Sequence, residues 1–250
     1  MMLPSSLFQR PIAHRAFHDV TQGRPENSRA AIRAAIAAGY GIEIDLQLSR
    51  DRQAMVFHDY DMSRLTGVSG PIQLRSAPEL ADTQLLNGEE GVPTFIEVLR
   101  IVAGQVPLLI ELKDQDGGMG PAIGTLEHAA IEALKGYRGD VALMSFNPHT
   151  VAELARLAPD LPRGLTTCSF QDEEWQTIKA TRLEELRAIP DYARVGASFV
   201  SHNCLDLDNP RITELKAQGA PVLCWTVYSA KQEAQARLVA DNVTFEGYTA

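Results

Sequence analysis

Short apolar runs alternate with segments of helical period across nearly all of the 250 residues of this chain. The runs predict strands over residues 11–14, 41–48, 54–58, 107–112, 141–146, 162–168, 193–201, 221–227 and 243–245. The segments between them predict helices over 28–38, 94–102, 122–134, 148–157, 173–188, 211–218 and 230–239. Because the strands are nearly continuous in apolar residues, the order favours an α/β fold of parallel strands covered by helices.

Two architectures fit that order, a (β/α)8 barrel and an open doubly wound sheet. We expect the barrel, because charged strings follow several different strands, and the active sites of such barrels form at the strands' carboxyl ends. The length fits a single domain over residues 1–250. Residues 59–92 are polar and lack a helical stripe, so we expect them to form a small excursion near the active-site mouth.

Composition restricts the partners and the location. The 32 acidic and 23 basic residues give a net charge of −9, which disfavours nucleic acid and anionic membranes as partners. Three cysteines without a CxxC pair are typical of reduced thiols. The amino terminus lacks the apolar core of a signal peptide, and no run approaches a membrane span. We therefore expect a cytoplasmic protein without stable membrane insertion, acting on a small molecule.

Carboxylates are the first candidate site residues. In the run GIEIDLQL, Glu43 and Asp45 point to the same face of a strand, about 7 Å apart. Glu111 ends another apolar run, with Lys113 again on its face. Interior salt bridges with Arg or Lys would account for such a pair, and so would a hard divalent cation, which favours carboxylate oxygens.

Histidines end two of the predicted strands, in the strings HR at 14–15 and HD at 58–59. A single histidine at a strand end is usually structural, but two near a carboxylate cluster can supply one base and one acid. We therefore expect His14 and His58 to be catalytic. Arg15 and Lys113 have the charge and geometry to hold phosphate oxygens.

Three further residues have less specific signals. Glu26, in the string RPENS, is either a site residue or an acid that favours the start of the next helix. Trp225 ends a late apolar run, where it belongs either to the core or to the site mouth. His18 is close enough to the first string to line the site. No glycine-rich phosphate loop is present, which disfavours nucleotide-driven chemistry. Neither a GxSxG elbow nor an HExxH motif is present.

The ordered set of these strings resembles the glycerophosphodiester phosphodiesterase family. The family pattern runs as HRG, PENT, an acidic pair in IExDV, HD, IPT before a helix, IELK and a late WTV. This chain has HRA, PENS, IEIDL, FHD, VPT, IELK and WTV in the same order. Each string is common by itself, but the ordered set is specific, and it is densest over residues 11–113.

The resemblance implies a (β/α)8 TIM barrel of the phospholipase C-like phosphodiesterase type, with a small insertion after the HD string. It implies one divalent metal ion, Mg²⁺ or Ca²⁺, held by Glu43, Asp45 and Glu111. The expected reaction, within lipid metabolism, is hydrolysis of a glycerophosphodiester to an alcohol and glycerol 3-phosphate.

The resemblance also assigns roles around the metal. It implies that His14 and His58 are the acid–base pair and that Trp225 packs against the alcohol part of the substrate. The positions that line the phosphate and metal site correspond to Arg15, Glu26 and Lys113.

The chain departs from the family pattern in places that leave the substrate's alcohol group open. Ala16 replaces the glycine of HRG, and the closing ITDxP string is replaced by residues 243–247. We expect the eighth covering helix to be short or absent. Two alternatives therefore stand beside the expected reaction: a related barrel acting on lysophospholipids or another phosphodiester, and a barrel that binds phosphodiesters without cleaving them.

Overall fold

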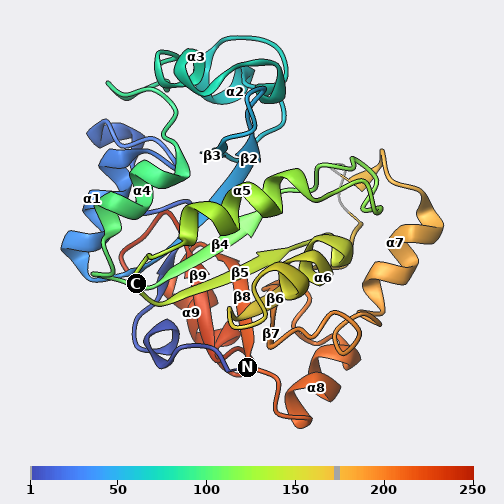
Figure 1. The fold of residues 1–250 in the computed structure, drawn as a ribbon. Coiled ribbons are helices and arrows are strands. Elements are labelled where there is room, and N and C mark those ends of the chain that lie inside the picture. Colours follow the sequence, from blue (N-terminus) through green and yellow to red (C-terminus); the bar gives the residue numbers. More distant parts are fainter. Residues whose placement is uncertain (1, 172–174) are drawn as a thin grey trace.

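The computed structural model describes residues 2–171 and 175–250, in which eight parallel strands close into a barrel (Figure 1). β1 pairs with β2 on one side and with β9 on the other, which closes the sheet and excludes an open doubly wound sheet. The expected barrel is confirmed. Its strands are β1 (Ile12–Ala13), β2 (Gly41–Leu48), β4 (Leu108–Leu112), β5 (Val141–Ser145), β6 (Arg163–Thr167), β7 (Phe199–Asn203), β8 (Val222–Val227) and β9 (Asn242–Phe245).

Helices connect successive barrel strands and cover the outside of the barrel (Figure 1). The side chains of Ser28 and Thr94 cap the first two of them. None of the helices in the described part of the chain is long and apolar enough to cross a membrane. The connecting helices are α1 (Arg29–Ala38), α4 (Phe95–Val102), α5 (Thr125–Leu134), α6 (Pro148–Leu157), α7 (Ala180–Arg187), α8 (Pro210–Ala217) and α9 (Ala230–Ala236).

The last residues of the chain, 246–250, form no helix after β9, as we expected from the altered closing string. Tyr248 and Ala250 instead pack against the core, and the Tyr40 hydroxyl donates a hydrogen bond of 2.8 Å to the Ala250 carbonyl.

Two predicted elements begin later than expected. Residues 193–198 alternate apolar and polar side chains like a strand, but Val195 N–H bonds to the Asp191 carbonyl and Gly196 has φ +62°, so this segment turns and β7 begins at Phe199. The first two residues of the helix predicted over 173–188 lie outside the described residues. In the part that is described, α7 begins at Ala180.

The strand predicted over 54–58 is not a barrel strand. It is observed as β3 (Ala54–Val56), which runs antiparallel to β2 and lies outside the barrel. The residues after it, which we call the excursion (residues 59–92), contain α2 (Ser63–Thr66), the 3-10 turn η3 (Ile72–Leu74) and α3 (Ala77–Ala81). In Figure 1 this excursion stands at the end of β2 and β3. It has an apolar cluster of its own, formed by Met55, Phe57, Met62, Leu65, Ile72, Ala77, Leu80, Leu85 and Val92.

The amino-terminal segment closes one end of the barrel interior. The 3-10 helix η1 (Ser5–Phe8) places Leu7 among interior side chains that include Leu109 and Phe199. Asn242 holds the segment there, because its side-chain amide donates to the carbonyls of Leu7 and Arg10 at 2.6 and 2.8 Å. The opposite end, where the parallel strands finish, is left for polar side chains.

Replacing Leu7 by alanine is expected to lower the free energy of unfolding by about 2–5 kcal/mol, because Leu7 is fully buried and its loss leaves a cavity. Urea unfolding measures the change. Met2→Ala is the control, since Met2 is 88% exposed, and its effect should stay within about 0.5 kcal/mol. Equal effects of the two substitutions would contradict the role assigned to this segment.

Candidate active site

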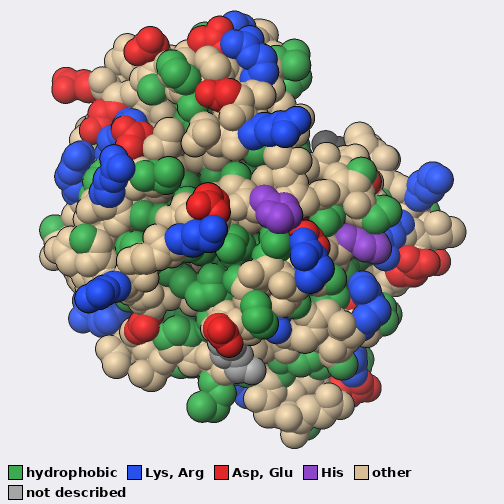
Figure 2. All heavy atoms as spheres, in the orientation of Figure 1, with side chains coloured by type: hydrophobic (Ala, Val, Ile, Leu, Met, Phe, Trp, Pro, Cys, Tyr) green, Lys and Arg blue, Asp and Glu red, His purple; other side chains and the backbone are tan. Residues whose placement is uncertain are grey.

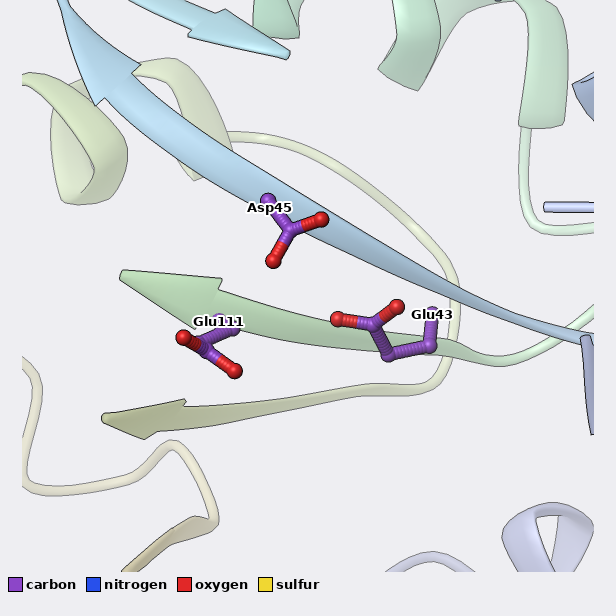
Figure 3. A group of neighbouring side chains, drawn as sticks. All are labelled: Glu43, Asp45 and Glu111. Carbon is purple, nitrogen blue, oxygen red and sulfur yellow. The ribbon is translucent and has the colours of Figure 1, made fainter. Parts of the chain in front are cut away.

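Three buried carboxyl groups meet on two neighbouring strands. Glu43 and Asp45 stand on β2 with Ile44 between them, so both point into the barrel. Glu111 on β4 pairs in register with Asp45. Figure 3 shows the three carboxyl groups turned toward a common space, and one oxygen from each lies within 4.8 Å of the others. The sequence predicted this cluster, which we call the acidic triad.

Cations neutralise only part of the acidic triad. Lys113 Nζ lies 2.8 Å from Asp45 Oδ1 and 2.7 Å from Glu111 Oε1, so the interior salt bridges considered from the sequence do exist. Among residues 2–171 and 175–250, however, Glu43 has no ion pair and accepts a backbone N–H of Arg15 at 2.9 Å. Burial and the charges of Asp45 and Glu111 raise the pKa of Glu43 well above its usual range. The triad therefore fits a further cation.

The chemistry of the triad suits a hard divalent metal, because all three donors are carboxylates on rigid strands. Asn27 supports this donor set: its side-chain amide donates to Asp45 Oδ2 at 2.9 Å. Asn27 belongs to the string PENS but was not singled out from the sequence.

His14 follows β1 and is held by a residue from the other end of the chain. Its Nδ1 lies 2.7 Å from Glu246 Oε2, and His18 Nε2 lies 3.3 Å from the same oxygen. Burial raises the pKa of Glu246, but the hydrogen bonds from both histidines outweigh burial and hold this pKa well below its usual range. An ionised carboxylate only accepts, so His14 donates from Nδ1 and keeps Nε2 for chemistry. Sequence reasoning missed Glu246, since nothing local links residues 14 and 246.

His58 has the same arrangement with its chain neighbour. His58 Nδ1 lies 2.7 Å from Asp59 Oδ1. In a continuous strand the two side chains would point to opposite faces, but β3 ends at Val56, so they can turn to the same side. Burial and the charge of Lys113 lower the pKa of His58 to about 4, against the opposing effect of Asp45. Its imidazole is therefore neutral near pH 7.

Arg15 contacts both the acidic triad and Glu26. Its backbone adopts φ +50° and that of Ala16 φ +66°, a conformation that favours the glycine of the family pattern. Arg15 Nη1 donates to Glu26 Oε1 at 2.8 Å, so Glu26 contacts the arginine rather than the acidic triad. Glu26 also binds Arg64, an exposed arginine of the excursion for which the sequence carried no signal.

A cavity of about 430 Å³ contains the acidic triad, both strand-end histidines and one apolar wall. Trp225 lines it, and its Nε1–H donates to the Ser201 carbonyl at 3.1 Å. Phe146 meets Trp225 edge to face at 5.5 Å between ring centroids, and Trp175 packs on Phe146 at 4.9 Å. The structure thus brings every predicted site residue except Glu26 and His18 to one cavity. These two line a second cavity instead, where Glu26 contacts Arg15 and His18 contacts Glu246.

The face of the molecule in Figure 2 shows acidic and basic side chains interspersed, without a patch of one sign.

The sequence profile of the Glycerophosphoryl diester phosphodiesterase family matches residues 14–244 of this chain. The chain belongs to this family. The resemblance inferred from the short strings is confirmed, and the protein is an enzyme of the phosphodiester hydrolase class. The matched range begins at His14 and takes in the acidic triad, His58 and Trp225.

Relatives in this family align with nearly the full length of this chain. The glycerophosphodiester phosphodiesterase of Caldanaerobacter subterraneus is 28% identical over 242 residues, which cover 93% of this chain and 90% of the relative. A phosphodiesterase of Oleispira antarctica, solved in complex with the product sn-glycerol-3-phosphate, superposes with a TM-score of 0.71 at 25% identity, covering 98% of this chain and 93% of that one. A glycerophosphodiester phosphodiesterase of Parabacteroides distasonis gives 0.74 at 25% identity, covering 94% and 91%.

Proposed function

We propose that this protein is a metal-dependent hydrolase that cleaves glycerophosphodiesters to an alcohol and glycerol 3-phosphate. The observation that carries the proposal is the cavity in which the acidic triad meets His14 and His58, each imidazole held by its own carboxylate. The product bound by the Oleispira antarctica relative, sn-glycerol-3-phosphate, supports the choice of substrate. We further propose that residues 1–250 act as one domain, with 59–92 contributing to the site.

Glu43, Asp45 and Glu111 would hold the metal, either Mg²⁺ or Ca²⁺. When bound, the metal polarises the phosphate and lowers the pKa of a coordinated hydroxyl or water. Arg15 and Lys113 hold the non-bridging phosphate oxygens. Support for this role of Arg15 comes from its buried Nε–H, which lies 3.7 Å from Asp45 Oδ2 and has no hydrogen-bond acceptor among the described residues.

The two histidines move the protons. One takes a proton at Nε2 from the attacking oxygen, which is either water or the substrate's own 2-hydroxyl, as a new O–P bond forms. The other donates a proton to the alcohol oxygen as its bond to phosphorus breaks. Attack by the 2-hydroxyl gives a cyclic phosphate. Water then opens this ring: one histidine takes the proton of the water, and the other returns a proton to the 2-oxygen as its bond to phosphorus breaks. Glu246 and Asp59 fix the tautomer of each imidazole throughout.

The apolar wall favours a second candidate substrate, a lysophospholipid. Phe146, Trp175 and Trp225 line the cavity together with Met119 and Met144, so one side of the site suits an apolar group. In this variant of the reaction the acidic triad and the histidines keep their roles, and the substrate carries an additional acyl group.

Removal of the metal by a chelator is expected to abolish hydrolysis of glycerophosphocholine, and one of Mg²⁺ and Ca²⁺ should restore it. The measurement is release of glycerol 3-phosphate, with acylated glycerophosphocholine tested in parallel. Preference for the acylated substrate would favour the lysophospholipid candidate. Full activity in the chelator would contradict the metal's role, and binding without hydrolysis under all conditions would leave only a phosphodiester binder.

A further inference from the structure

Arg64 forms bidentate hydrogen bonds with two carboxylates. On one edge of its guanidinium group, Nε and Nη2 donate to the two Asp59 oxygens at 2.7 and 2.8 Å. On the other edge, Nη1 and Nη2 donate to the two Glu26 oxygens at 2.8 and 2.9 Å. Such a double fork is the geometry for which the planar guanidinium is suited, and lysine cannot reproduce it.

Each of the two carboxylates holds a different part of the active site. Asp59 Oδ1 accepts from His58 Nδ1 at 2.7 Å, so the Asp59 side chain orients the imidazole. Glu26 Oε1 accepts from Arg15 Nη1 at 2.8 Å, so the Glu26 side chain orients the guanidinium group. One continuous series of hydrogen bonds therefore runs from His58 through Arg64 to Arg15, between segments that follow β3 and β1.

The excursion provides a firm support for Arg64. α2 carries Arg64 between Met62 and Leu65, which are both buried in the excursion's apolar cluster. Thr66 Oγ1 donates to the Met62 carbonyl at 2.8 Å, and Gly67 ends the helix at φ +73°. The backbone on which Arg64 stands is thus fixed by packing, although the side chain itself reaches across an open surface.

An ordinary surface ion pair contributes little, with a median of about 0–1 kcal/mol, because both partners are exposed and mobile. The partners of Arg64 differ from that case. The side chains of Glu26 and Asp59 are only 12% and 20% exposed, and each is bound by two nitrogens of Arg64 and by a second site residue. The contact therefore restricts groups that are already inside the active site.

We propose that Arg64 is a positioning residue that aligns His58 through Asp59 and Arg15 through Glu26, so that the excursion serves to complete the active site. The inference rests on the proposed function, in which His58 transfers a proton and Arg15 holds the phosphate. A misplacement of about 1 Å at a reacting group can lower a rate by roughly 10²-fold. Loss of Arg64 should therefore act on the chemical step.

Kinetics of Arg64→Met on the metal-loaded protein test this role. We expect kcat to fall by roughly 10–100-fold, with a much smaller change in KM. Arg50→Met is the matched control, because Arg50 lies in the turn between β2 and β3, pairs with Glu79 of the excursion at 3.0 Å and contacts none of the site residues. It should keep the kcat of the parent. An unchanged kcat in Arg64→Met, or an equal loss in Arg50→Met, would overturn the proposal.

A second measurement does not depend on activity. The Nδ1–H resonances of His58 and His14 report their hydrogen bonds to Asp59 and Glu246, and His58→Ala and His14→Ala assign them. Arg64→Met should shift or broaden the His58 signal and leave the His14 signal in place; two unchanged signals would contradict the proposal. If the parent hydrolyses no glycerophosphodiester, the proposed function fails, while these spectra still decide whether Arg64 positions His58.

Discussion

Replacing His14 or His58 by alanine is expected to lower kcat by roughly 10²–10⁴-fold, because a positioned acid or base supplies a rate enhancement of that size. Both imidazoles lie in the cavity of the acidic triad, and both present Nε2 because Nδ1 donates to a carboxylate. Neither substitution removes a residue of the apolar core, so the barrel should stay folded.

The control for this pair is His128→Ala, whose side chain is 62% exposed on α5 and lies outside the cavity. Its activity and melting temperature should equal those of the parent. Steady-state hydrolysis, with thermal melting on the same samples, checks the prediction. Activity near the parental value in both His14→Ala and His58→Ala would sink the proposed acid–base mechanism.

Glu43→Gln is expected to abolish metal-dependent activity without destabilising the metal-free protein. The folded state raises the pKa of Glu43 through burial and its two acidic neighbours. At neutral pH the unfolded chain carries Glu43 as a carboxylate, so the raised pKa in the folded state weakens folding, and glutamine removes this cost. The amide oxygen can still accept the Arg15 backbone N–H, which the Glu43 carboxylate accepts at 2.9 Å.

Melting curves with and without metal separate the two effects of Glu43→Gln. In a chelator the variant should melt no lower than the parent. Added Mg²⁺ or Ca²⁺ should raise the melting temperature of the parent but not that of the variant. Loss of a residue that only hydrogen-bonds to a metal ligand lowers activity by roughly 10–100-fold. Loss of the ligand Glu43 itself should lower activity by more than that. A variant that keeps both its activity and its metal-induced stabilisation would remove Glu43 from the metal site.

Sequence patterns were most informative where the relevant contact is local. The two-residue period of a strand places Glu43 and Asp45 on one face whatever surrounds them, and the exact bounds 41–48 of β2 follow from that period. The caps of α1 and α4 are equally local. Patterns were misleading where local hydrogen bonds form a turn in place of strand pairing. Residues 193–198 alternate like a strand, but they form such a turn.

Contacts between distant segments could not be obtained in this way. Glu246 reaches His14 only because β9 lies beside β1 when the barrel closes. Arg64 reaches Glu26 only because the excursion folds back over the loop after β1. Both are ordinary charged residues, and no sequence pattern assigned a role to either of them.

The amino-acid sequence by itself was sufficient to predict the barrel, the acidic triad, the two histidines and the family. These features follow from the strand period and from short strings, and both can be recognised from residues that are close together in the chain. The tertiary structure decided which carboxylate orients each histidine, that β3 leaves the barrel, and that Arg64 connects the two halves of the site. The physical reason is that hydrogen bonds depend on distance in space, and barrel closure brings together residues as far apart in the chain as 14 and 246.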